Sequence, residues 1–256
     1  MLATTAISPS PAALARAERL ARELSARLVR RGNRSLAQLM RRERDDLILV
    51  VSETDAKLVP LSGRPVFFHP GMAYLRLLRL LAGHDDPLVA VSGAKRGDVI
   101  IDCTMGMAAD AIILSWAAGE TGSVTALESE QVLYVLVREG LMTYEGEPPE
   151  LVAAMRRIRP VWTDHLAYLR HLPDKSADIV YFDPMFRVGT SGGPLDRVRG
   201  FVNNAPVSPE AIREARRVAR RAVIMKEKRD SGEWARLGFE TVRPSNSGIA
   251  YGVIEP

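Results

Sequence analysis

The segment DVIIDCTMGMAADAIILSWAAG, residues 98–119, gives the strongest indication of the fold. Its first five residues are a short apolar run that ends at Asp102, and Gly106 lies in the residues that follow. A longer apolar stretch of helical length begins at Ala108. A strand, a tight turn and a helix in this order form the unit from which parallel sheets are built.

The same alternation continues towards the C-terminus. Runs typical of strands are SVTALE (123–128), RPVWTD (159–164), ADIVYFD (177–183) and RAVIMK (221–226), and helical stretches lie between them. This pattern predicts an α/β fold with a parallel sheet covered on both faces. The last two runs, GFETVRP (238–244) and GIAYGVIE (248–255), are separated by Ser-Asn-Ser and predict an antiparallel hairpin.

The first 96 residues have a different organisation. Helical spacing over 11–28 and 35–42 is followed by two runs typical of strands, DLILVV and AKLVPL. We therefore expect a small N-terminal α/β appendage over residues 1–64. A connecting segment with a helix from about residue 72 to 81 should occupy 65–96, and the main domain should occupy 97–256.

Composition excludes several classes of protein. Hydrophobic residues make up 46% of the 256 residues and charged residues 26%, which excludes a disordered or fibrous chain. A single cysteine, Cys103, excludes an intramolecular disulfide, and four histidines without i, i+4 spacing predict no metal site. No apolar run reaches the roughly 20 residues that cross a bilayer, so we expect no membrane association and a cytoplasmic location.

The basic residues are almost all arginine. The formal net charge is +4, and residues 1–45 hold ten arginines against four acidic residues. Arginine presents a rigid fork of donors that fits phosphate, so this segment is either a nucleic-acid-binding face or a solvated helix surface.

Ligands of open α/β sheets bind beyond the carboxyl ends of the strands, and acidic residues occupy these positions here. Asp102 ends the first strand and would suit an ammonium group but repel a phosphate, while Gly106 permits close approach of the backbone. The alternative for both residues is a capping aspartate and a turn glycine.

The next two strands also end on acidic residues. Glu128 could accept hydrogen bonds from both hydroxyls of a ribose, or it could cap the next helix. Asp164, followed by His165, could accept from the amino group of an adenine, or it could be a helix N-cap.

The fourth strand ends in Asp183-Pro184-Met185-Phe186. Asp183 and Pro184 alone could be turn residues. Together with three acidic strand ends, however, they match a site for S-adenosylmethionine, which has no phosphate but has an ammonium, a carboxylate, a ribose and an adenine.

These motifs resemble those of class I S-adenosylmethionine-dependent methyltransferases, and within them the small-subunit ribosomal RNA guanine-N2 methyltransferases. The resemblance covers residues 97–228 and is carried by DCTMGMAADA, TALESE, TDHLAYL, YFDPMF and, more loosely, AVIMK. It implies a Rossmann-like sheet of seven strands and S-adenosylmethionine as cofactor. The predicted cofactor-binding residues are Asp102, Thr104, Gly106, Asp110, Glu128, Ser129, Asp164, His165 and Asp183. The family usually has a glycine where this chain has Ala108.

The resemblance also implies the reaction, which is N-methylation of an exocyclic amine of an RNA base, with guanine N2 of ribosomal RNA as the expected target and rRNA processing as the process. Asp183 and the carbonyl of Pro184 would accept hydrogen bonds from the amine, and Asp183 could take the released proton. Phe186 would stack on the base. Asp183, Pro184 and Phe186 are therefore the predicted catalytic residues.

Two other functions remain open from the sequence. One is a methyltransferase of the same fold that acts on a small molecule or a protein side chain, and the other is a non-catalytic RNA-binding protein. Lys226 and Arg187 could contact the RNA backbone or be solvated charges at strand ends. His69 could reach over the site or pack on Pro70.

Overall fold

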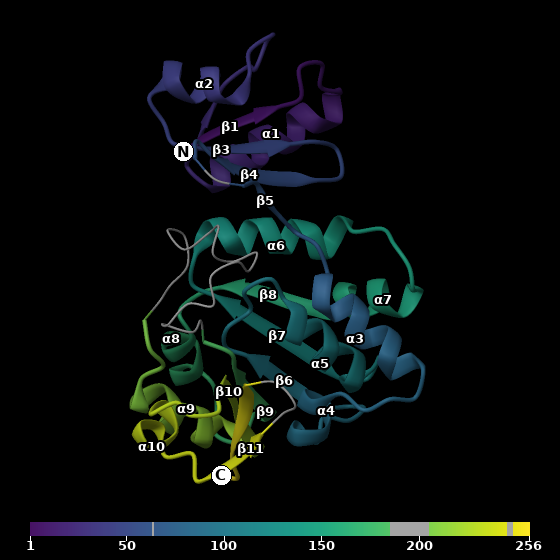
Figure 1. The fold of residues 1–256 in the computed structure, drawn as a ribbon, viewed down its shortest axis with the longest axis vertical. Helices are drawn as coiled ribbons and strands as arrows, with labels where there is room; N and C mark the ends of the chain where they lie inside the picture. Colours follow the sequence, from purple (N-terminus) through teal and green to yellow (C-terminus); the bar gives the residue numbers. More distant parts are fainter. Residues whose placement is uncertain (63, 185–204, 245–247) are drawn as a thin grey trace. The chain divides into compact units, whose positions relative to one another are not determined.

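The computed structural model describes residues 1–62, 64–184, 205–244 and 248–256 (Figure 1). These residues form two compact units. The first unit comprises Met1–His69 and Gln131–Tyr144, and the second comprises the other described residues from Pro70 onward.

The second unit is built on a seven-stranded sheet with the strand order β11-β12-β10-β9-β6-β7-β8. The strands are β6 (Val99–Asp102), β7 (Ser123–Glu128), β8 (Ile158–Trp162), β9 (Ala177–Phe182), β10 (Ala219–Lys228), β11 (Thr241–Pro244) and β12 (Ile249–Ile254). Strand β12 runs antiparallel to both of its neighbours, β10 and β11, whereas the other neighbouring pairs of this sheet are parallel. The predicted Rossmann-like sheet with a C-terminal antiparallel hairpin is confirmed.

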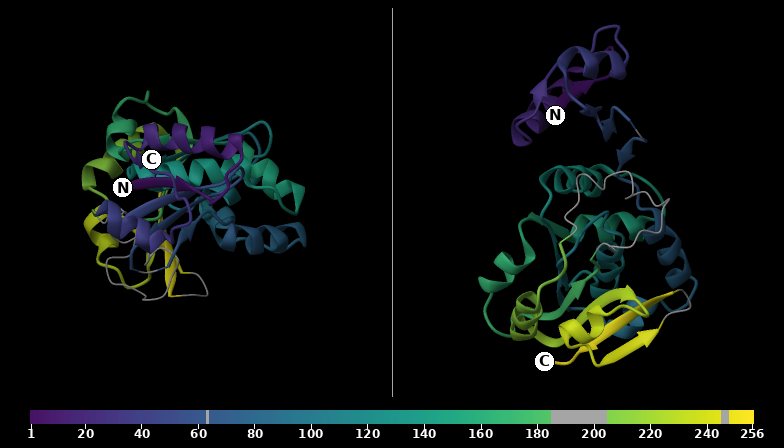
Figure 2. Two further views of the ribbon diagram at one scale, coloured as in Figure 1. Left: turned by 90° about the horizontal axis from the view of Figure 1, so that it is seen from above. Right: turned by 60° about the vertical axis from the view of Figure 1, so that its left-hand side comes forward.

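Helices cover both faces of this sheet (Figure 1, Figure 2). One face carries α8 (His165–Arg170), α9 (Pro209–Val218) and α10 (Glu233–Leu237). The other carries α3 (Gly71–Leu81), α4 (Pro87–Ser92), α5 (Ala109–Ala118) and α7 (Pro149–Arg157). Because both faces are buried, the central strands carry consecutive apolar residues rather than an alternating pattern, as in Ile179–Phe182 of β9 and Ala222–Met225 of β10.

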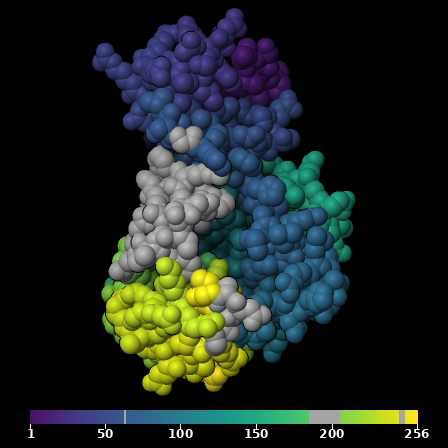
Figure 3. Space-filling model, viewed as in Figure 1, coloured from purple at the N-terminus to yellow at the C-terminus, as the bar shows by residue number. Residues whose placement is uncertain are grey.

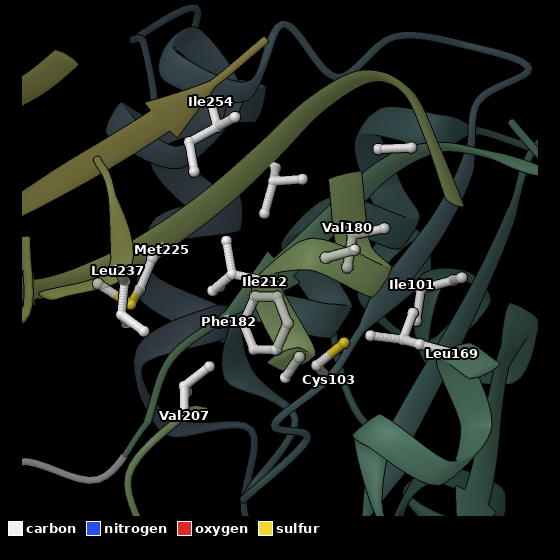
Figure 4. Close-up of a cluster of buried hydrophobic side chains, with 14 of the residues drawn as sticks. Ile101, Cys103, Leu169, Val180, Phe182, Val207, Ile212, Met225, Leu237 and Ile254 are labelled. Carbon is white, nitrogen blue, oxygen red and sulfur yellow. The ribbon is translucent and has the colours of Figure 1, made fainter. Parts of the chain in front are cut away.

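The packing on one of these faces is shown in Figure 4. Phe182 of β9 and Met225 of β10 are fully buried there and pack with Ile212 of α9 and with Leu169 of α8. Cys103 lies in the same cluster, and burial raises the pKa of its thiol well above the usual range. The thiol is therefore part of the core and is not a reactive nucleophile.

The first unit contains a five-stranded sheet with the order β2-β1-β3-β4-β5. Its strands are β1 (Leu2–Thr5), β2 (Arg27–Leu28), β3 (Leu47–Val51), β4 (Ala56–Pro60) and β5 (Val66–Phe67), and its helices are α1 (Pro11–Glu23), α2 (Leu36–Glu43) and α6 (Gln131–Thr143). The small N-terminal α/β appendage is confirmed. Its first helix is shorter than expected, because Ser25 adopts a left-handed φ of 48° and β2 pairs with β1.

Helices α1 and α2 pack on opposite faces of the small sheet. Leu20 of α1 packs with Leu49 and with Leu136 of α6, whereas Leu39 and Met40 of α2 lie in a separate cluster on the other face. Neighbouring residues of a strand point to opposite faces, and for this reason β1 and β3 supply side chains to both clusters.

A buried carboxylate ties α1 to α6. Glu139 of α6 accepts hydrogen bonds from Arg16 and Arg19 of α1 and from Arg138. Burial acts to raise the pKa of Glu139, but these guanidinium groups outweigh it and lower the pKa to about 2. Two of the ten N-terminal arginines therefore have an internal role.

Several short elements lie outside the sequence expectations: β1, β2, β5, α4, α7 and α10. Strands of two to four residues and helices of five or six carry too few residues to show a period. In the case of α7, Pro148 is the N-cap residue and Pro149 the first helical residue, and this proline pair obscures the start of a nine-residue amphipathic helix in the sequence.

Gly252 of β12 provides a test of packing in the second unit. A Cβ atom at this position would lie 2.6 Å from Phe239 Cδ1 and 2.6 Å from Trp234 Cζ3. We expect Gly252→Ala to destabilise the unit by about 1–3 kcal/mol, the usual range for overpacking. The measurement is urea unfolding, monitored by tryptophan fluorescence. The loss of stability caused by Gly252→Ala should be smaller when Phe239→Leu is also present. An unchanged unfolding midpoint in Gly252→Ala would contradict this packing.

Candidate functional site

The carboxyl ends of β6, β7, β8 and β9 meet at one edge of the large sheet. Strand β6 lies at its centre, between β7 on one side and β9 on the other, and the chain order reverses at the β6–β9 pair. Such a reversal is the point at which open α/β sheets bind ligands. The four acidic residues predicted from the strand ends, Asp102, Glu128, Asp164 and Asp183, all follow or end these strands.

Thr104 joins the ends of β6 and β9. Its backbone N–H and its hydroxyl both lie within hydrogen-bond distance of Asp102 Oδ1, at 3.0 and 3.4 Å. Its Oγ1 accepts from the backbone N–H of Asp183 at 2.6 Å. The two aspartates on either side of the strand-order reversal are thus connected through one threonine.

The turn after β6 uses two left-handed residues, Gly106 with a φ of 48° and Ala108 with a φ of 62°. Ala108 is the N-cap residue of α5 and occupies a conformation that favours glycine. The glycine usual at this position in the resembling family therefore has a conformational reason, and this chain tolerates alanine in its place.

Glu128 closes the same turn from β7. Its Oε2 accepts from Gly106 N–H at 3.1 Å and its Oε1 accepts from Glu130 N–H at 3.0 Å. Each carboxylate oxygen can accept a second hydrogen bond, so the group could also receive donors from a ligand. Burial is the largest cause of the raised pKa of Glu128, and the two backbone donors oppose it.

The end of β8 is organised by a helix cap. Asp164 is the N-cap of α8 and its Oδ1 accepts from Ala167 N–H at 2.9 Å, as the capping alternative expected. The ring of His165 packs edge-on against Phe182, with centroids 5.6 Å apart. Burial lowers the pKa of His165 despite the neighbouring Asp164.

Trp162, at the last position of β8, was not expected from the sequence to be a site residue. Its Nε1–H donates to the carbonyl of Ser129 at 3.0 Å, and the side chain is 52% exposed. An aromatic ring held by its edge with much of its surface open is suited to stacking on a planar ligand.

A chain of ion pairs lies beside these residues and centres on Asp110 of α5. Its Oδ1 pairs with Arg76 of α3, and its Oδ2 accepts from Lys226 Nζ at 3.0 Å and from the Tyr181 hydroxyl at 2.8 Å. Burial acts to raise the pKa of Asp110, but Lys226 and Arg76 outweigh it and hold the pKa far below its usual range. Arg76 is itself held by the two oxygens of Asp86 at 2.7 and 2.8 Å.

Asp183 lies at the other end of this chain of ion pairs. Lys226 Nζ donates to its Oδ2 at 2.7 Å, and among the described residues no donor reaches its Oδ1. Burial raises the pKa of Asp183 to about 7, although Lys226 opposes the shift and Asp110 adds to it. One oxygen is thus fixed, the other is available, and the group titrates near neutrality.

Asp102 is the third carboxyl with a shifted pKa. It is 1% exposed, and burial together with the neighbouring carboxylates Asp110, Asp183 and Glu128 raises its pKa to about 8, against the hydrogen bond from Thr104. A carboxyl in this situation gains most from a cationic group placed beside it.

The structure separates the predicted site residues into three groups. Five make direct hydrogen bonds within two separate sets: Asp102, Thr104 and Asp183 form one, and Gly106 and Glu128 form the other. Asp110 is linked to Asp183 through Lys226. At the same edge, the Ser129 carbonyl accepts from Trp162, Asp164 caps α8, and the His165 ring packs on Phe182. Pro184 directly follows Asp183, while Phe186 and Arg187 lie outside the described residues.

The expectation that Lys226 contacts RNA or is a solvated charge is wrong, because its ammonium is shared by Asp110 and Asp183. Strand register gives the reason. Met225 of β10 pairs with Phe182 of β9, so Lys226 follows beside Asp183. The AVIMK motif contains Lys226 and the YFDPMF motif contains Tyr181, but no motif in the sequence indicated Arg76 or Asp86.

Two features are absent from the described part of the chain. No group of three or more His, Cys, Asp or Glu side chains there has the arrangement of a metal site. No helix in those residues is long and apolar enough to cross a membrane.

Comparisons with known proteins agree with this geometry. A family model described as “Putative SAM-dependent methyltransferase” matches residues 34–230. A protein of Bacillus subtilis (strain 168), named “Uncharacterized protein YpiP”, is 38% identical over 254 residues, which are 98% of this chain and 98% of that protein. Ribosomal RNA small subunit methyltransferase J of Acinetobacter baumannii (strain SDF) is 28% identical over 90 residues, 34% of this chain and 31% of that protein.

A solved structure supports the fold. The crystal structure of a SAM-dependent methyltransferase from Neisseria gonorrhoeae superimposes with a TM-score of 0.65 at 17% identity, covering 100% of this chain and 96% of that chain. The family model spans well over half of the sequence. This chain therefore belongs to the family of S-adenosylmethionine (SAM)-dependent methyltransferases, and S-adenosylmethionine is its cofactor.

Proposed function

We propose that the enzyme N-methylates an exocyclic amine of an RNA base, with guanine N2 of ribosomal RNA as the target. The observation that carries this proposal is the Asp183 carboxylate, which Lys226 fixes through Oδ2, while no donor from the described residues reaches Oδ1, which could accept from an amine. The partial similarity to a ribosomal RNA methyltransferase supports RNA as the substrate class.

The residues at the strand ends fit the cofactor. Asp102 is a buried carboxyl whose pKa is raised to about 8, and the ammonium group of S-adenosylmethionine would supply the cation that it lacks. Glu128 keeps acceptor capacity for two ribose hydroxyls beyond its backbone donors. Thr104 and Gly106 hold these two acids in place through the hydrogen bonds described above.

The adenine would lie near the end of β8. Ser129, Asp164 and His165 are the residues we assign to this part of the cofactor, and the exposed ring of Trp162 lies beside Ser129. Asp110 differs from the others, because both of its oxygens already bind cationic or hydroxyl donors. We assign Asp110 to positioning Lys226 rather than to direct contact with the cofactor.

When bound, S-adenosylmethionine supplies a methyl group activated by a sulfonium. An exocyclic amine is a weak nucleophile because its lone pair is delocalised into the ring. Asp183 Oδ1 and the Pro184 carbonyl would each accept one N–H of the amine, which directs the lone pair away from the ring plane. When the methyl group passes from sulfur to nitrogen, Asp183 would take the proton that leaves the nitrogen.

The predicted stacking role of Phe186 completes the proposed site, since aromatic stacking on an unpaired base contributes about 1–3 kcal/mol. Holding the amine and the methyl group in line would supply a larger part of the rate, of the order of 7–11 kcal/mol. These two contributions need no metal.

Asp183→Ala tests the proposal. It should lower methyl transfer at least about 100-fold, the lower range for loss of a general base, while S-adenosylmethionine affinity changes little. The assay follows labelled methyl groups into small-subunit ribosomal RNA from a strain that lacks the gene, and calorimetry measures cofactor binding.

Asp174→Ala is the matched control, because Asp174 is an exposed aspartate just before the amino end of the same strand, β9. This variant should keep full activity. Full activity in Asp183→Ala would refute the catalytic role of Asp183. Transfer of label only to components of a metabolite extract, and not to RNA, would overturn the substrate class.

The pH dependence gives a second test. Asp183 must be ionised to accept from the amine, so kcat should rise with pH through an apparent pKa of about 7. Among the described residues, the charged and titratable groups that face it are Lys226 of β10, Asp110 of α5, Asp102 of β6 and Tyr181 of β9. Of these, Lys226 alone is a cation and favours the ionised form.

Lys226→Met should therefore raise the pKa of Asp183 and move the acidic limb of the kcat profile upward by at least about one pH unit. Lys226→Arg keeps the positive charge and should leave the limb near its original position. Carbon-13 NMR titration of labelled aspartate side chains measures the same shift without the reaction. If neither the acidic limb of the kcat profile nor the pKa of Asp183 from NMR changes in Lys226→Met, Lys226 does not set the pKa of Asp183.

A further inference from the structure

Most of the basic character of the chain is concentrated in one short segment. Residues 27–46 contain seven arginines and three carboxylates, a net charge of +4, which equals the formal net charge of all 256 residues. The rest of the chain is therefore formally neutral. A local excess of this size in a nearly balanced protein indicates a surface for an anionic partner.

The fold places this segment at one edge and on one face of the small sheet. It comprises the edge strand β2, a connection and α2, whose Leu39 and Met40 are buried against Leu2 and Ile48. The apolar side of α2 is thus occupied, and its polar side faces outward. The segment contributes to the near surface of its unit in Figure 3.

The contacts divide the arginines of the unit into two classes. Arg16 and Arg19 hold Glu139, and Arg27 and Arg42 pair with Glu43. A second class is exposed and has no hydrogen-bond or ion-pair partner for its side chains among the described residues. Within residues 27–46 it consists of Arg30, Arg34, Arg41 and Arg44, which we call the arginine surface.

Helix electrostatics explain only part of this surface. Arg41 lies in the last turn of α2 and Arg44 is its C-cap residue, where positive charge stabilises a helix. Arg34 lies directly before the N-cap Ser35, at the end of the helix where positive charge is unfavourable, and Arg30 lies four residues earlier. Arginines placed there serve something other than the stability of α2.

We infer that the arginine surface binds the phosphodiester backbone of RNA, which gives the enzyme a second contact with the substrate class of the proposed function, on which this inference rests. Guanidinium forks match phosphate oxygens geometrically. Residues 27–46 contain no aromatic side chain to stack on bases, so the contact is with the backbone and is independent of base sequence.

An anionic membrane surface would complement the positive charge of the arginine surface, but membrane binding also needs an exposed apolar face. Membrane-surface helices insert an apolar face, and the apolar face of α2 is already buried in its own unit. RNA needs only the exposed charges.

The test uses the full-length chain with Arg30→Gln, Arg34→Gln, Arg41→Gln and Arg44→Asn combined. Asparagine is chosen at position 44 because Arg44 has a left-handed φ of 54°, which asparagine tolerates. The matched control removes four exposed arginines of the second unit that likewise have no hydrogen-bond or ion-pair partner for their side chains there. These are Arg96, Arg159, Arg213 and Arg216. Circular dichroism and calorimetry with S-adenosylmethionine should show that both variants keep their fold.

Binding of a short fluorescein-labelled single-stranded RNA is followed by fluorescence anisotropy over a series of NaCl concentrations, without cofactor. Each phosphate contact contributes about 0.7 to the slope of log affinity against log salt for a single strand. The arginine-surface variant should therefore lose about 3 from this slope and bind at least about tenfold more weakly at low salt, whereas the control should stay close to the parent.

Equal slopes in the arginine-surface variant and the control would overturn the inference. So would binding to phosphatidylglycerol vesicles that depends on these arginines while RNA binding does not. RNA binding that depends on the arginine surface, together with methyl transfer to no RNA, would refute the proposed function and leave the surface standing. Methyl transfer to RNA, together with unchanged RNA binding in the arginine-surface variant, would refute the inference and leave the proposed function standing.

Discussion

The site depends on one lysine placed between two buried carboxylates. Lys226 donates to Asp110 at 3.0 Å and to Asp183 at 2.7 Å, and without this cation the two acids would face each other across the ends of α5 and β9. Burying like charges close together is strongly unfavourable unless a counter-charge and hydrogen bonds compensate. The register of β10 on β9 supplies this counter-charge, because Met225 pairs with Phe182 and Lys226 follows.

The same lysine has different effects on its two partners. Asp110 also binds Arg76 and the Tyr181 hydroxyl, so its pKa lies far below the usual range and it remains a fixed negative charge. Among the described residues, Lys226 is the one cationic partner of Asp183, which also faces Asp110, and burial raises the pKa of Asp183 to about 7. Because their pKa values differ, the two acids can have different roles: Asp110 fixes the position of Lys226, and Asp183 exchanges a proton.

Much of this arrangement could be predicted from the order of residues along the chain. Acidic residues after successive strand runs meet at one edge whenever the strands are parallel, and for this reason Asp102, Glu128 and Asp183 could be grouped without a structure. Arg76 could not, because it comes from a helix before the first strand of the sheet, and only tertiary packing brings it to Asp110. The position of Lys226 was visible in the AVIMK run, but its partner follows from strand register, which the sequence leaves open.

The arginines of the first unit show a second limit of prediction from the sequence. Counting charges over residues 1–45 treats all ten as one population, although the structure gives Arg16 and Arg19 an internal role at Glu139. Their carboxylate partner lies in α6, more than a hundred residues away, so no local count can detect it. Arg34 and Arg41 lack such a partner within the described residues, and they stay solvated at the surface. Whether an arginine stabilises a fold or can bind an external anion therefore depends on which carboxylates folding brings within reach, and pairing separates the two classes where composition does not.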